Sequence, residues 1–465
     1  MSFIGIQYAL FFIAVFSVYW ILGRRLQNLW LLAASYGFYA AWDWRFLGLI
    51  VLSTVVDFIA GRRIDGSGSV LARRGWLALS LSVNLGILGL FKYANFFLAS
   101  LQDLANAVGW NLSAPVLDII LPVGISFYTF QTLSYTLDIY LGRLKPTDSI
   151  LDFAAFVAFF PQLVAGPIVR AREFLFQLDA PRTFNYGMFE QGLGRFAAGF
   201  FKKAIIADNL ALMIVDPVFA SPASYGTFSL WVAALAYAAQ IYADFSGYSS
   251  MAIGSAAMLG FTLPENFRFP YLAKDFSDFW RRWHITMSRF FRDYVYIPLG
   301  GSRGTAVRTR TNLAATTLVS GLWHGASWTF VAWGGLHGIF IMATHILRTG
   351  ERSSSAFGAF LGWVATFLGV LFAWILFRAQ TFGDAAVFFK GLWGQDGQAI
   401  PVPALAVLLM IAVVADHAYG WLSEQEDWSL DRIPRPALAA GVAALVVFAY
   451  HAFPATATPF IYFQF

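Results

Sequence analysis

Apolar runs long enough to cross a membrane recur from one end of this 465-residue chain to the other. The first extends from Ser2 to Leu22, and a bilayer core requires a helix of about 20 apolar residues. Charged residues make up 12% of the chain, whereas a soluble domain carries roughly 25%. Too little polar surface therefore exists to coat several soluble domains. We predict an all-α integral membrane protein that forms a single polytopic domain over residues 1–465.

Basic clusters between the apolar runs predict the orientation. Arg24 and Arg25 follow the first run, and a second cluster, at 62–74, follows two shorter runs at about 29–42 and 47–60. Two crossings separate the clusters, so both lie on one side, which the positive-inside rule assigns to the cytoplasm. The N-terminus is then predicted to lie outside. A net charge of +5 in this loop pattern is typical of membrane proteins, and we expect no nucleic-acid binding.

Further apolar runs lie near residues 75–101, 116–141, 150–168, 192–219, 228–262, 312–347, 357–378, 403–422 and 436–454. Together the runs predict about eleven transmembrane helices plus re-entrant or interfacial helices. Several runs are interrupted, for example at Pro161, Gly321 and Gly325. Broken helices survive at membrane depth only where protein or a water-filled cavity covers the freed backbone groups. We therefore expect a central tunnel.

Polar residues inside two of these runs are candidates for that tunnel. Residues 126–140 carry seven polar side chains, among them Asp138, and an ionisable group at this depth indicates function by default. The alternative is that Asp138 hydrogen-bonds a neighbouring helix. Asp244 lies between two apolar stretches, where it would line the same cavity or cap a helix starting near Ser246. For Asp244 we favour the cap or a packing role.

Arginines and aromatic residues alternate over residues 276–303. This mixture predicts an interfacial helix whose apolar face lies among the lipid headgroups. Its arginines, Arg281 and Arg282 among them, either anchor that helix or form a cationic entrance for an anionic donor such as a phosphopantetheine thioester. His284 lies in the same segment as an anchor, a tunnel-lining hydrogen bonder or a catalytic group.

His324 is the strongest catalytic candidate. It follows the basic loop that ends at Arg310, and the intervening helix would place it roughly 20 Å into the membrane. At that depth an imidazole is either neutral or, when charged, energetically unfavourable. When hydrated, it gains and loses a proton near physiological pH. Neighbouring glycines leave space for a substrate beside the ring. His337 follows on the next stretch and either reaches the same cavity or packs.

The chain contains no cysteine, which excludes disulfides and a cysteine nucleophile. Its six histidines form no HExxH pair and no short cluster with metal-ligand spacing. There is also no glycine-rich phosphate loop after a strand. We expect no metal and no permanently bound cofactor.

Two long motifs, WRRWHITMSRFFRDYVYIPLGG and SGLWHGASWTFVAWGGLHG, resemble the signature of the membrane-bound O-acyltransferase (MBOAT) superfamily. The resemblance is greatest to the bacterial branch that O-acetylates alginate. It continues in FPQLVAGPIVR, FKKAIIADNLA, YADFSGYSSMAIG and the terminal PFIYFQF, and so spans nearly the whole chain. Ser250 departs from the pattern, because relatives often carry an acidic residue there.

The resemblance implies helices around a tunnel in a bacterial inner membrane, with the N-terminus in the periplasm. It implies that His324 is catalytic and that His284 is a second functional histidine near the cytoplasmic mouth. His324 would act as the general base for a hydroxyl that attacks a thioester. Ser327 and Trp328 are candidates to stabilise the oxyanion, and Asp138 and His284 would position the donor or tune His324. We favour direct transfer over an acyl-histidine.

The resemblance also implies the partners. The donor would be acetyl-CoA or an acyl carrier protein, and a separate periplasmic acetyltransferase would complete transfer to a polysaccharide. An alginate-like exopolysaccharide or acetylated cellulose is the preferred acceptor, and peptidoglycan is the second choice. The third choice is teichoic acid, which would receive D-alanine by the same chemistry. The alternative function is that of a polytopic transporter, which would lie in the same membrane lipid. It would predict facing charge pairs and inverted repeats, which this sequence does not show.

Overall fold

The computed structural model describes residues 3–164, 166–347, 355–425, 444, 447–449, 451–454 and 458–460. Over these residues the secondary structure is helical, and the single extended pairing is an isolated bridge between Tyr225 and Gln398. The predicted all-α class is confirmed. The chain divides into two compact units, which are considered separately. The first unit comprises residues 1–196 and 249–264, and the second comprises residues 197–248 and 265–465.

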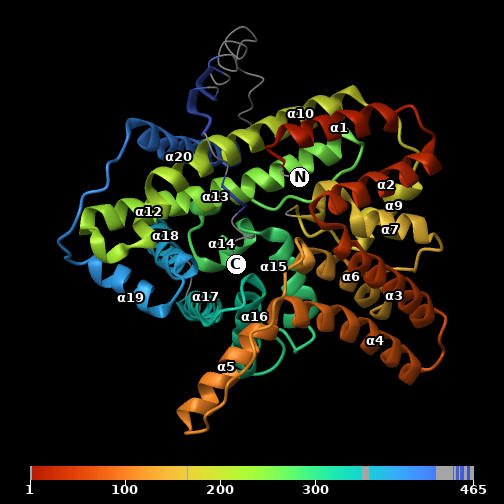
Figure 1. Cartoon of the computed structure of the whole chain (residues 1–465), viewed down its shortest axis with the longest axis horizontal. Coiled ribbons are helices and arrows are strands. Elements are labelled where there is room, and N and C mark those ends of the chain that lie inside the picture. The colour runs from red at the N-terminus through yellow and green to blue at the C-terminus, as the bar shows by residue number, and fades with distance from the viewer. Residues whose placement is uncertain are drawn as a thin grey trace. The chain divides into compact units, whose positions relative to one another are not determined.

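The helices follow one another along the chain as labelled in Figure 1. The first unit contains α1 (Ile6–Tyr19), α2 (Arg24–Asp43), α3 (Leu47–Asp65), α4 (Val70–Leu88), α5 (Ala94–Ala107), α6 (Ile125–Tyr140), α7 (Ile150–Ala158), α8 (Phe160–Leu163) and α9 (Ala171–Asp179). The second unit contains α11 (Asp208–Leu210), α12 (Asp216–Ala220), α14 (Phe276–Arg282), α15 (Ile285–Phe291), α16 (Ala306–His324), α17 (Trp328–Leu347), α18 (Ala356–Arg378), α19 (Phe382–Gly391) and α20 (Ala404–Gln425). Two helices, α10 (Tyr186–Phe200) and α13 (Thr227–Met258), contribute residues to both units.

Five helical stretches of the described chain are long and apolar enough to cross a membrane. They are Arg24–Asp65, Val70–Ala107, Trp328–Ile346, Ala356–Arg378 and Ala404–Glu424. Apolar side chains on their outer surfaces are exposed, as at Ile59 and Leu408, which suits contact with lipid. The chain is therefore a multi-pass membrane protein.

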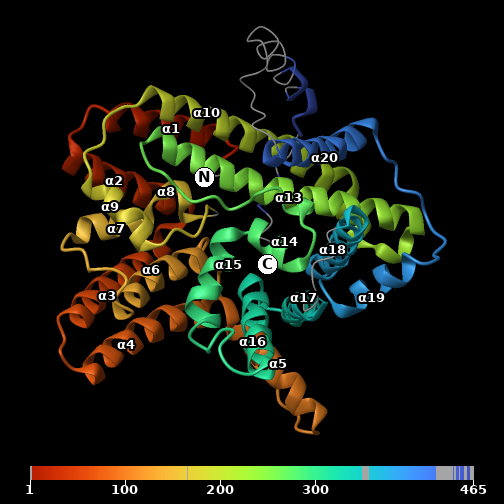
Figure 2. The ribbon, with the colours of Figure 1, turned by 180° about the vertical axis from the view of Figure 1, so that it is seen from behind.

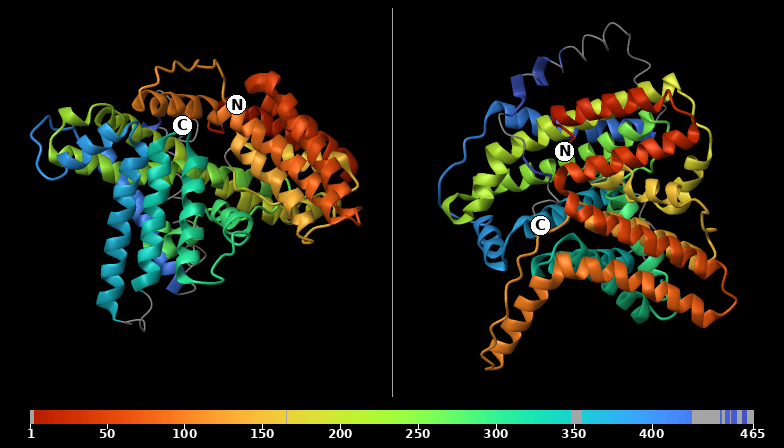
Figure 3. Two further views of the ribbon diagram at one scale, coloured as in Figure 1. Left: turned by 90° about the horizontal axis from the view of Figure 1, so that it is seen from below. Right: turned by 45° about the vertical axis from the view of Figure 1, so that its right-hand side comes forward.

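In the first unit, α3, α4 and α6 lie side by side (Figure 3) around a buried carboxylate. Asp57 on α3 is 0% exposed. It accepts hydrogen bonds from Ser80 Oγ at 2.5 Å and from Asn84 Nδ2 at 2.9 Å, both on α4. Thr136 of α6 joins the network through the Ser80 hydroxyl, 3.0 Å away. Thr136, one of the polar residues of α6, thus faces α4.

Two of the predicted interruptions are present, at Pro161 and Gly325, whereas the one at Gly321 is wrong, because α16 continues through Gly321 to His324. The run at 150–168 splits into α7 and α8 just before Pro161, since proline cannot donate the backbone hydrogen bond of a continuing helix. Gly124 begins α6 with φ +75°, and a Cβ there would lie 2.6 Å from Leu163 O. Only glycine fits both the left-handed backbone and this close approach.

In the second unit, α16 and α17 form an antiparallel hairpin, and α18 packs against α17 (Figure 2). Glycines make the hairpin close. A Cβ on Gly334 would lie 2.3 Å from Thr317 O, and one on Gly321 would lie 2.2 Å from Phe330 O. Small residues let membrane helices approach until their backbones touch. The run at 312–347 is broken after His324, as predicted, and this break positions the candidate site.

Two predictions about local structure are wrong. Residues 276–303 are not one interfacial helix, because α14 ends at Arg282 and α15 begins at Ile285, with His284 at the break. Asp244 does not cap a helix near Ser246, because α13 already runs continuously from Thr227 and the Asp244 carboxylate pairs with a buried lysine instead. The run at 436–454 and the terminal motif fall mostly outside the described residues.

Candidate active site

His324 is the last residue of α16 and is enclosed by aromatic rings. Its side chain is 2% exposed. The ring centroids of Trp323, Trp333 and Phe377 lie 5.1, 5.0 and 5.6 Å from that of His324. We call these three residues the aromatic cage. Gly325 makes room for it, since a Cβ there would lie 2.2 Å from the ring of Phe330. The imidazole is therefore buried among aromatic rings, where electrostatic interactions are stronger than in water.

His284, the second predicted functional histidine, lies in the same unit and close to His324. The two ring centroids are 6.3 Å apart, and the ring of Trp323 lies 5.9 Å from that of His284. The structure thus brings together two histidines that are 40 residues apart in the sequence, numbers 284 and 324. Their proximity supports the view that both act at one site.

Asn266 determines the tautomer of His284. Its Oδ1 accepts from Thr286 N at 3.3 Å and from Thr286 Oγ1 at 2.9 Å. Because a backbone N–H can only donate, this Asn266 atom is the oxygen. His284 Nδ1, 3.1 Å from the same oxygen, must therefore carry the proton. The lone pair of His284 resides on Nε2.

The backbone at His284 is in the left-handed region, with φ +43° and ψ +53°. A non-glycine residue there is uncommon, and such strain concentrates at functional sites. The turn is held by Ile285 N, which donates to Asn266 O at 2.9 Å. Complete burial lowers the pKa of His284 to about 3. The imidazole is therefore neutral at physiological pH.

His337 lines a cavity of about 180 Å³ between the α14–α15 segment and the α16–α17 hairpin. Trp280 Nε1 donates to His337 Nδ1 at 3.3 Å, so the proton of the neutral imidazole resides on Nε2. His337 is 1% exposed, and its Nε2 has no hydrogen-bond partner in the described part of the chain. A buried donor without a partner is unfavourable by about 1–3 kcal/mol, which a ligand carbonyl in the cavity would relieve.

The cavity is largely apolar, and Trp333 forms the wall that it shares with the aromatic cage; His324 itself does not line the cavity. The ring of Trp333 lies 4.7 Å from His337 and 5.0 Å from His324. Arg292, whose side chain is 60% exposed, also lines the cavity and marks its opening at the surface. The other lining residues are Trp280, Met287, Ser288, Phe291, Tyr296, Leu313, Thr316, Thr317, Ser320, Gly334 and Ile341.

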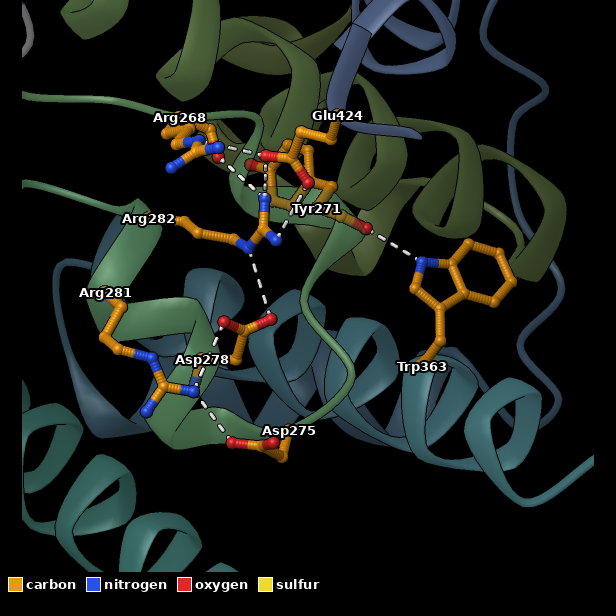
Figure 4. Close-up of polar contacts among 8 residues, drawn as sticks. All are labelled: Arg268, Tyr271, Asp275, Asp278, Arg281, Arg282, Trp363 and Glu424. Atoms are coloured by element: carbon orange, nitrogen blue, oxygen red, sulfur yellow. Dashed lines mark hydrogen bonds and ion pairs between the residues drawn. The ribbon is translucent and has the colours of Figure 1, made fainter. Parts of the chain in front are cut away.

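The two predicted arginines have different environments, as Figure 4 shows. Arg282 is 19% exposed and forms a bidentate pair with Glu424 of α20, at 2.8 and 3.1 Å. It also contacts Asp278 at 3.2 Å. Arg281 is 60% exposed and lies 3.3 Å from Asp278. Arg282 thus ties α14 to α20, whereas Arg281 is mostly exposed and pairs within α14.

The predicted oxyanion residues lie at the start of α17. Ser327 Oγ accepts from Thr329 N at 3.3 Å and lies 2.9 Å from Thr329 Oγ1, as a helix-capping hydroxyl does. Trp328 is 56% exposed. They lie three and four residues after His324 in the sequence, and their role in stabilising an oxyanion stays a prediction.

Asp138 belongs to the first unit, apart from the residues above. Its carboxylate is 0% exposed and lies 3.6 Å from Arg172 Nε and 3.9 Å from Arg143 Nη1. A buried carboxylate normally requires such cationic partners. Its proposed role towards the donor stays a prediction.

Sequence analysis missed three buried polar residues. Asp57 and Lys203 are each a charge inside an apolar run, and Asn266 follows the α13 helix in a loop. The two charges were detectable, because ionisable groups are expensive in a membrane. Asn266 carried no comparable signal, since an asparagine in a loop is ordinary.

The chain resembles known proteins over most of its length. A family model described as MBOAT, membrane-bound O-acyltransferase family, matches residues 143–382. A probable alginate O-acetylase of Azotobacter vinelandii is 40% identical, with 96% of each chain covered. A probable alginate O-acetylase of Pseudomonas aeruginosa is 44% identical over 82% of this chain and 74% of its own length. A peptidoglycan O-acetyltransferase of Helicobacter pylori is 38% identical over 82% and 77%, respectively.

Proposed function

The chain belongs to the membrane-bound O-acyltransferase family, and we propose that it transfers an acetyl group from a cytoplasmic thioester towards hydroxyls of an alginate-like exopolysaccharide. One structural observation carries the proposal. His324 lies in an aromatic cage beside His284 and shares Trp333 with a cavity lined by His337. This arrangement supplies a base and a largely apolar pocket for a small acyl donor.

His324 is the general base in this proposal. It removes the proton of the attacking hydroxyl as the C–O bond forms, and the proton passes to the departing thiolate as the C–S bond breaks. Such catalysis typically contributes about 10²- to 10⁴-fold. The chain has no cysteine, which leaves direct transfer or an acyl-histidine, and we favour direct transfer. His284 stays neutral and orients the reacting groups near His324.

The donor's thioester end occupies the cavity. A cavity of about 150 Å³ is large enough for benzene, and the volume here, about 180 Å³, is large enough for an acetyl-thioethyl group. The His337 Nε2–H would donate to a carbonyl of the donor. Arg281 and Arg292, both with side chains 60% exposed, would attract its phosphate groups. Acetyl-CoA and an acylated carrier protein both present this thioester.

The finer topology is also part of the proposal. About eleven transmembrane helices with re-entrant segments would surround a tunnel in the bacterial inner membrane, with the N-terminus in the periplasm. The basic clusters and the broken helices support this arrangement. A periplasmic acetyltransferase would receive the acetyl group and complete its transfer. Ser327, Trp328 and Asp138 keep their predicted roles.

Acetate released by alkali from purified exopolysaccharide and peptidoglycan tests the proposal. Cells would carry the wild-type chain, His324→Ala or the control His345→Ala at equal membrane levels. His345 is an exposed histidine of α17. We expect His324→Ala to abolish acetate on the exopolysaccharide and His345→Ala to preserve it. Full acetylation by His324→Ala would overturn the assignment of the base.

Peptidoglycan O-acetylation is the second candidate, because the Helicobacter pylori relative carries that name at 38% identity. Loss of acetate from peptidoglycan alone would support it. D-alanylation of teichoic acid ranks third, since a teichoic acid D-alanyltransferase of Streptococcus thermophilus aligns with only 47% of this chain. If neither polymer changes, another acyl group or acceptor would be tested next.

A further inference from the structure

Three sequence motifs that the proposed reaction does not use meet around one buried lysine of the second unit. Lys203, from FKKAIIADNLA, is 1% exposed. Its Nζ lies 2.7 Å from Asp208 Oδ1 and 2.5 Å from Asp244 Oδ1, the latter from YADFSGYSSMAIG. It also donates to Thr458 O at 3.1 Å, next to the terminal PFIYFQF. Three donors of the ammonium therefore meet three acceptors.

The net negative charge of this cluster gives Thr458, the third partner of Lys203, a stabilising role. Two carboxylates surround one ammonium, and all three side chains are at most 3% exposed. The Thr458 hydroxyl donates to Asp208 and so supplies a neutral donor to the excess negative charge. Hydrogen bonds to buried ions are about twice as strong as those between neutral groups. Thr458 is thus held by a charged cluster at both its carbonyl and its hydroxyl.

The segment next to Thr458 continues towards the candidate active site. Phe460 is 1% exposed, and its ring lies 4.3 Å from Tyr248 and 5.7 Å from Phe245. The ring of Phe245 in turn packs edge-on against His284, with centroids 4.6 Å apart. A continuous row of contacts therefore runs from the cluster through Phe460 and Phe245 to His284.

The helices that carry the cluster are packed closely together. A Cβ on Gly247, between Asp244 and Tyr248 on α13, would lie 2.7 Å from Gly199 O and 2.9 Å from Lys203 N. The backbones that carry Lys203 and Asp244 are therefore in direct contact. The Lys203–Asp208–Asp244 cluster is therefore a firm point of attachment. The mobility of residues 458–460 then depends on their own contacts with this cluster.

We propose that the Lys203–Asp208–Asp244 cluster anchors residues Thr458–Phe460, and that the anchored segment positions His284 through Phe245. Lys203 and Thr458 are then positioning residues, since neither contacts the reacting groups. The kinetic consequence rests on the proposed acetyl transfer, whereas the anchoring does not.

A threonine series in the full-length chain tests both parts. Thr458→Val removes the hydroxyl at nearly constant volume, and Thr458→Ser restores it. The matched control is Thr366→Val, which removes a buried hydroxyl that bonds only within its own helix, to Gly362 O at 2.7 Å. Hydrogen exchange of the peptide containing residues 458–460 reports anchoring. Initial rates of labelled acetyl transfer, in inverted vesicles given acetyl-CoA and cytosol, report kcat and apparent KM.

For Thr458→Val we expect amide hydrogen exchange at residues 458–460 to be at least about tenfold faster and kcat to be about tenfold lower. These factors correspond to the loss of one hydrogen bond to a charged group. The apparent KM for acetyl-CoA should change less than twofold, and Thr458→Ser and Thr366→Val should resemble the wild type. Unchanged exchange in Thr458→Val would overturn the anchor. Faster exchange with unchanged kcat would overturn the positioning of His284. Absence of transfer by the wild type would refute the proposed function, while exchange would still test the anchor.

Discussion

Adding one methyl group to the α16–α17 hairpin should disable the enzyme without touching a reactive residue. In Gly334→Ala, the new Cβ would lie 2.3 Å from Thr317 O. Ordinary contact begins at 3.4 Å, so the backbones would have to separate by 1.1 Å (3.4 − 2.3). Overpacking of this kind destabilises by about 1–3 kcal/mol. It should also displace Trp333, the preceding residue, from His324.

The functional effect should exceed the effect on stability. A misplacement of about 1 Å in a catalytic site can lower the rate roughly 100-fold. We therefore expect acetyl transfer by Gly334→Ala to fall by about two orders of magnitude. The matched control is Gly335→Ala, whose Cβ would lie 3.3 Å from Leu318 Cδ2. That contact is 0.1 Å short (3.4 − 3.3) and is made by the flexible end of a side chain.

The assay compares initial rates of labelled acetyl transfer in vesicles that contain equal amounts of each variant. Thermal unfolding in detergent measures the change in stability. Gly335→Ala should transfer at close to the wild-type rate, and its helix should gain up to about 1 kcal/mol over glycine. Wild-type transfer by Gly334→Ala would show that the position of the hairpin does not control His324, and would refute this reasoning.

Three further predictions concern the histidines. His337→Phe should raise the apparent KM for the donor about tenfold with little change in kcat, because it removes one hydrogen bond to bound donor; equal KM values would contradict a donor-binding role. Asn266→Ala should lower the free energy of unfolding by about 1–3 kcal/mol, since buried donors lose their acceptor; thermal unfolding checks this. Burial lowers the pKa of His284 from 6.5 to about 3, so the unfolded chain binds a proton below pH 6.5 that the folded chain excludes. Stability should therefore fall as the pH drops, by about 2 kcal/mol at pH 5, and His284→Asn should lose this component; identical pH dependence of unfolding in both proteins would contradict it.

Run length, apolar composition and the energetic cost of polar groups in a membrane predicted the all-α membrane class, whereas the count of about eleven transmembrane helices stays a prediction. Membrane spans follow from length and apolar composition alone, and the breaks at Pro161 and after His324 follow from residues that cannot continue a helix or that bring backbones together. His324 stands out in the sequence because an imidazole is rare and costly at membrane depth, and its catalytic role stays a prediction. These inferences depend on one residue or one run at a time.

Features that depend on distant partners were not predictable. The helix break at His284 arises because Asn266 hydrogen-bonds the backbone and the ring of that turn. No pattern in the sequence around His284 predicts this break. Asp244 looked like a helix cap because its partner Lys203 is 41 residues away in the sequence (244 − 203). Arg281 and Arg282 were equivalent in the sequence, and only Glu424 of α20 distinguishes them.

The left-handed backbone at His284 restricts which replacements can separate chemistry from folding. Alanine, leucine or a β-branched residue would add conformational strain to the loss of the imidazole, and an inactive variant would then report both. Asparagine adopts this conformation far more readily and is therefore the informative replacement. Most other replacements at position 284 would therefore destabilise the turn as well as remove the imidazole, so that loss of the histidine and loss of stability would occur together.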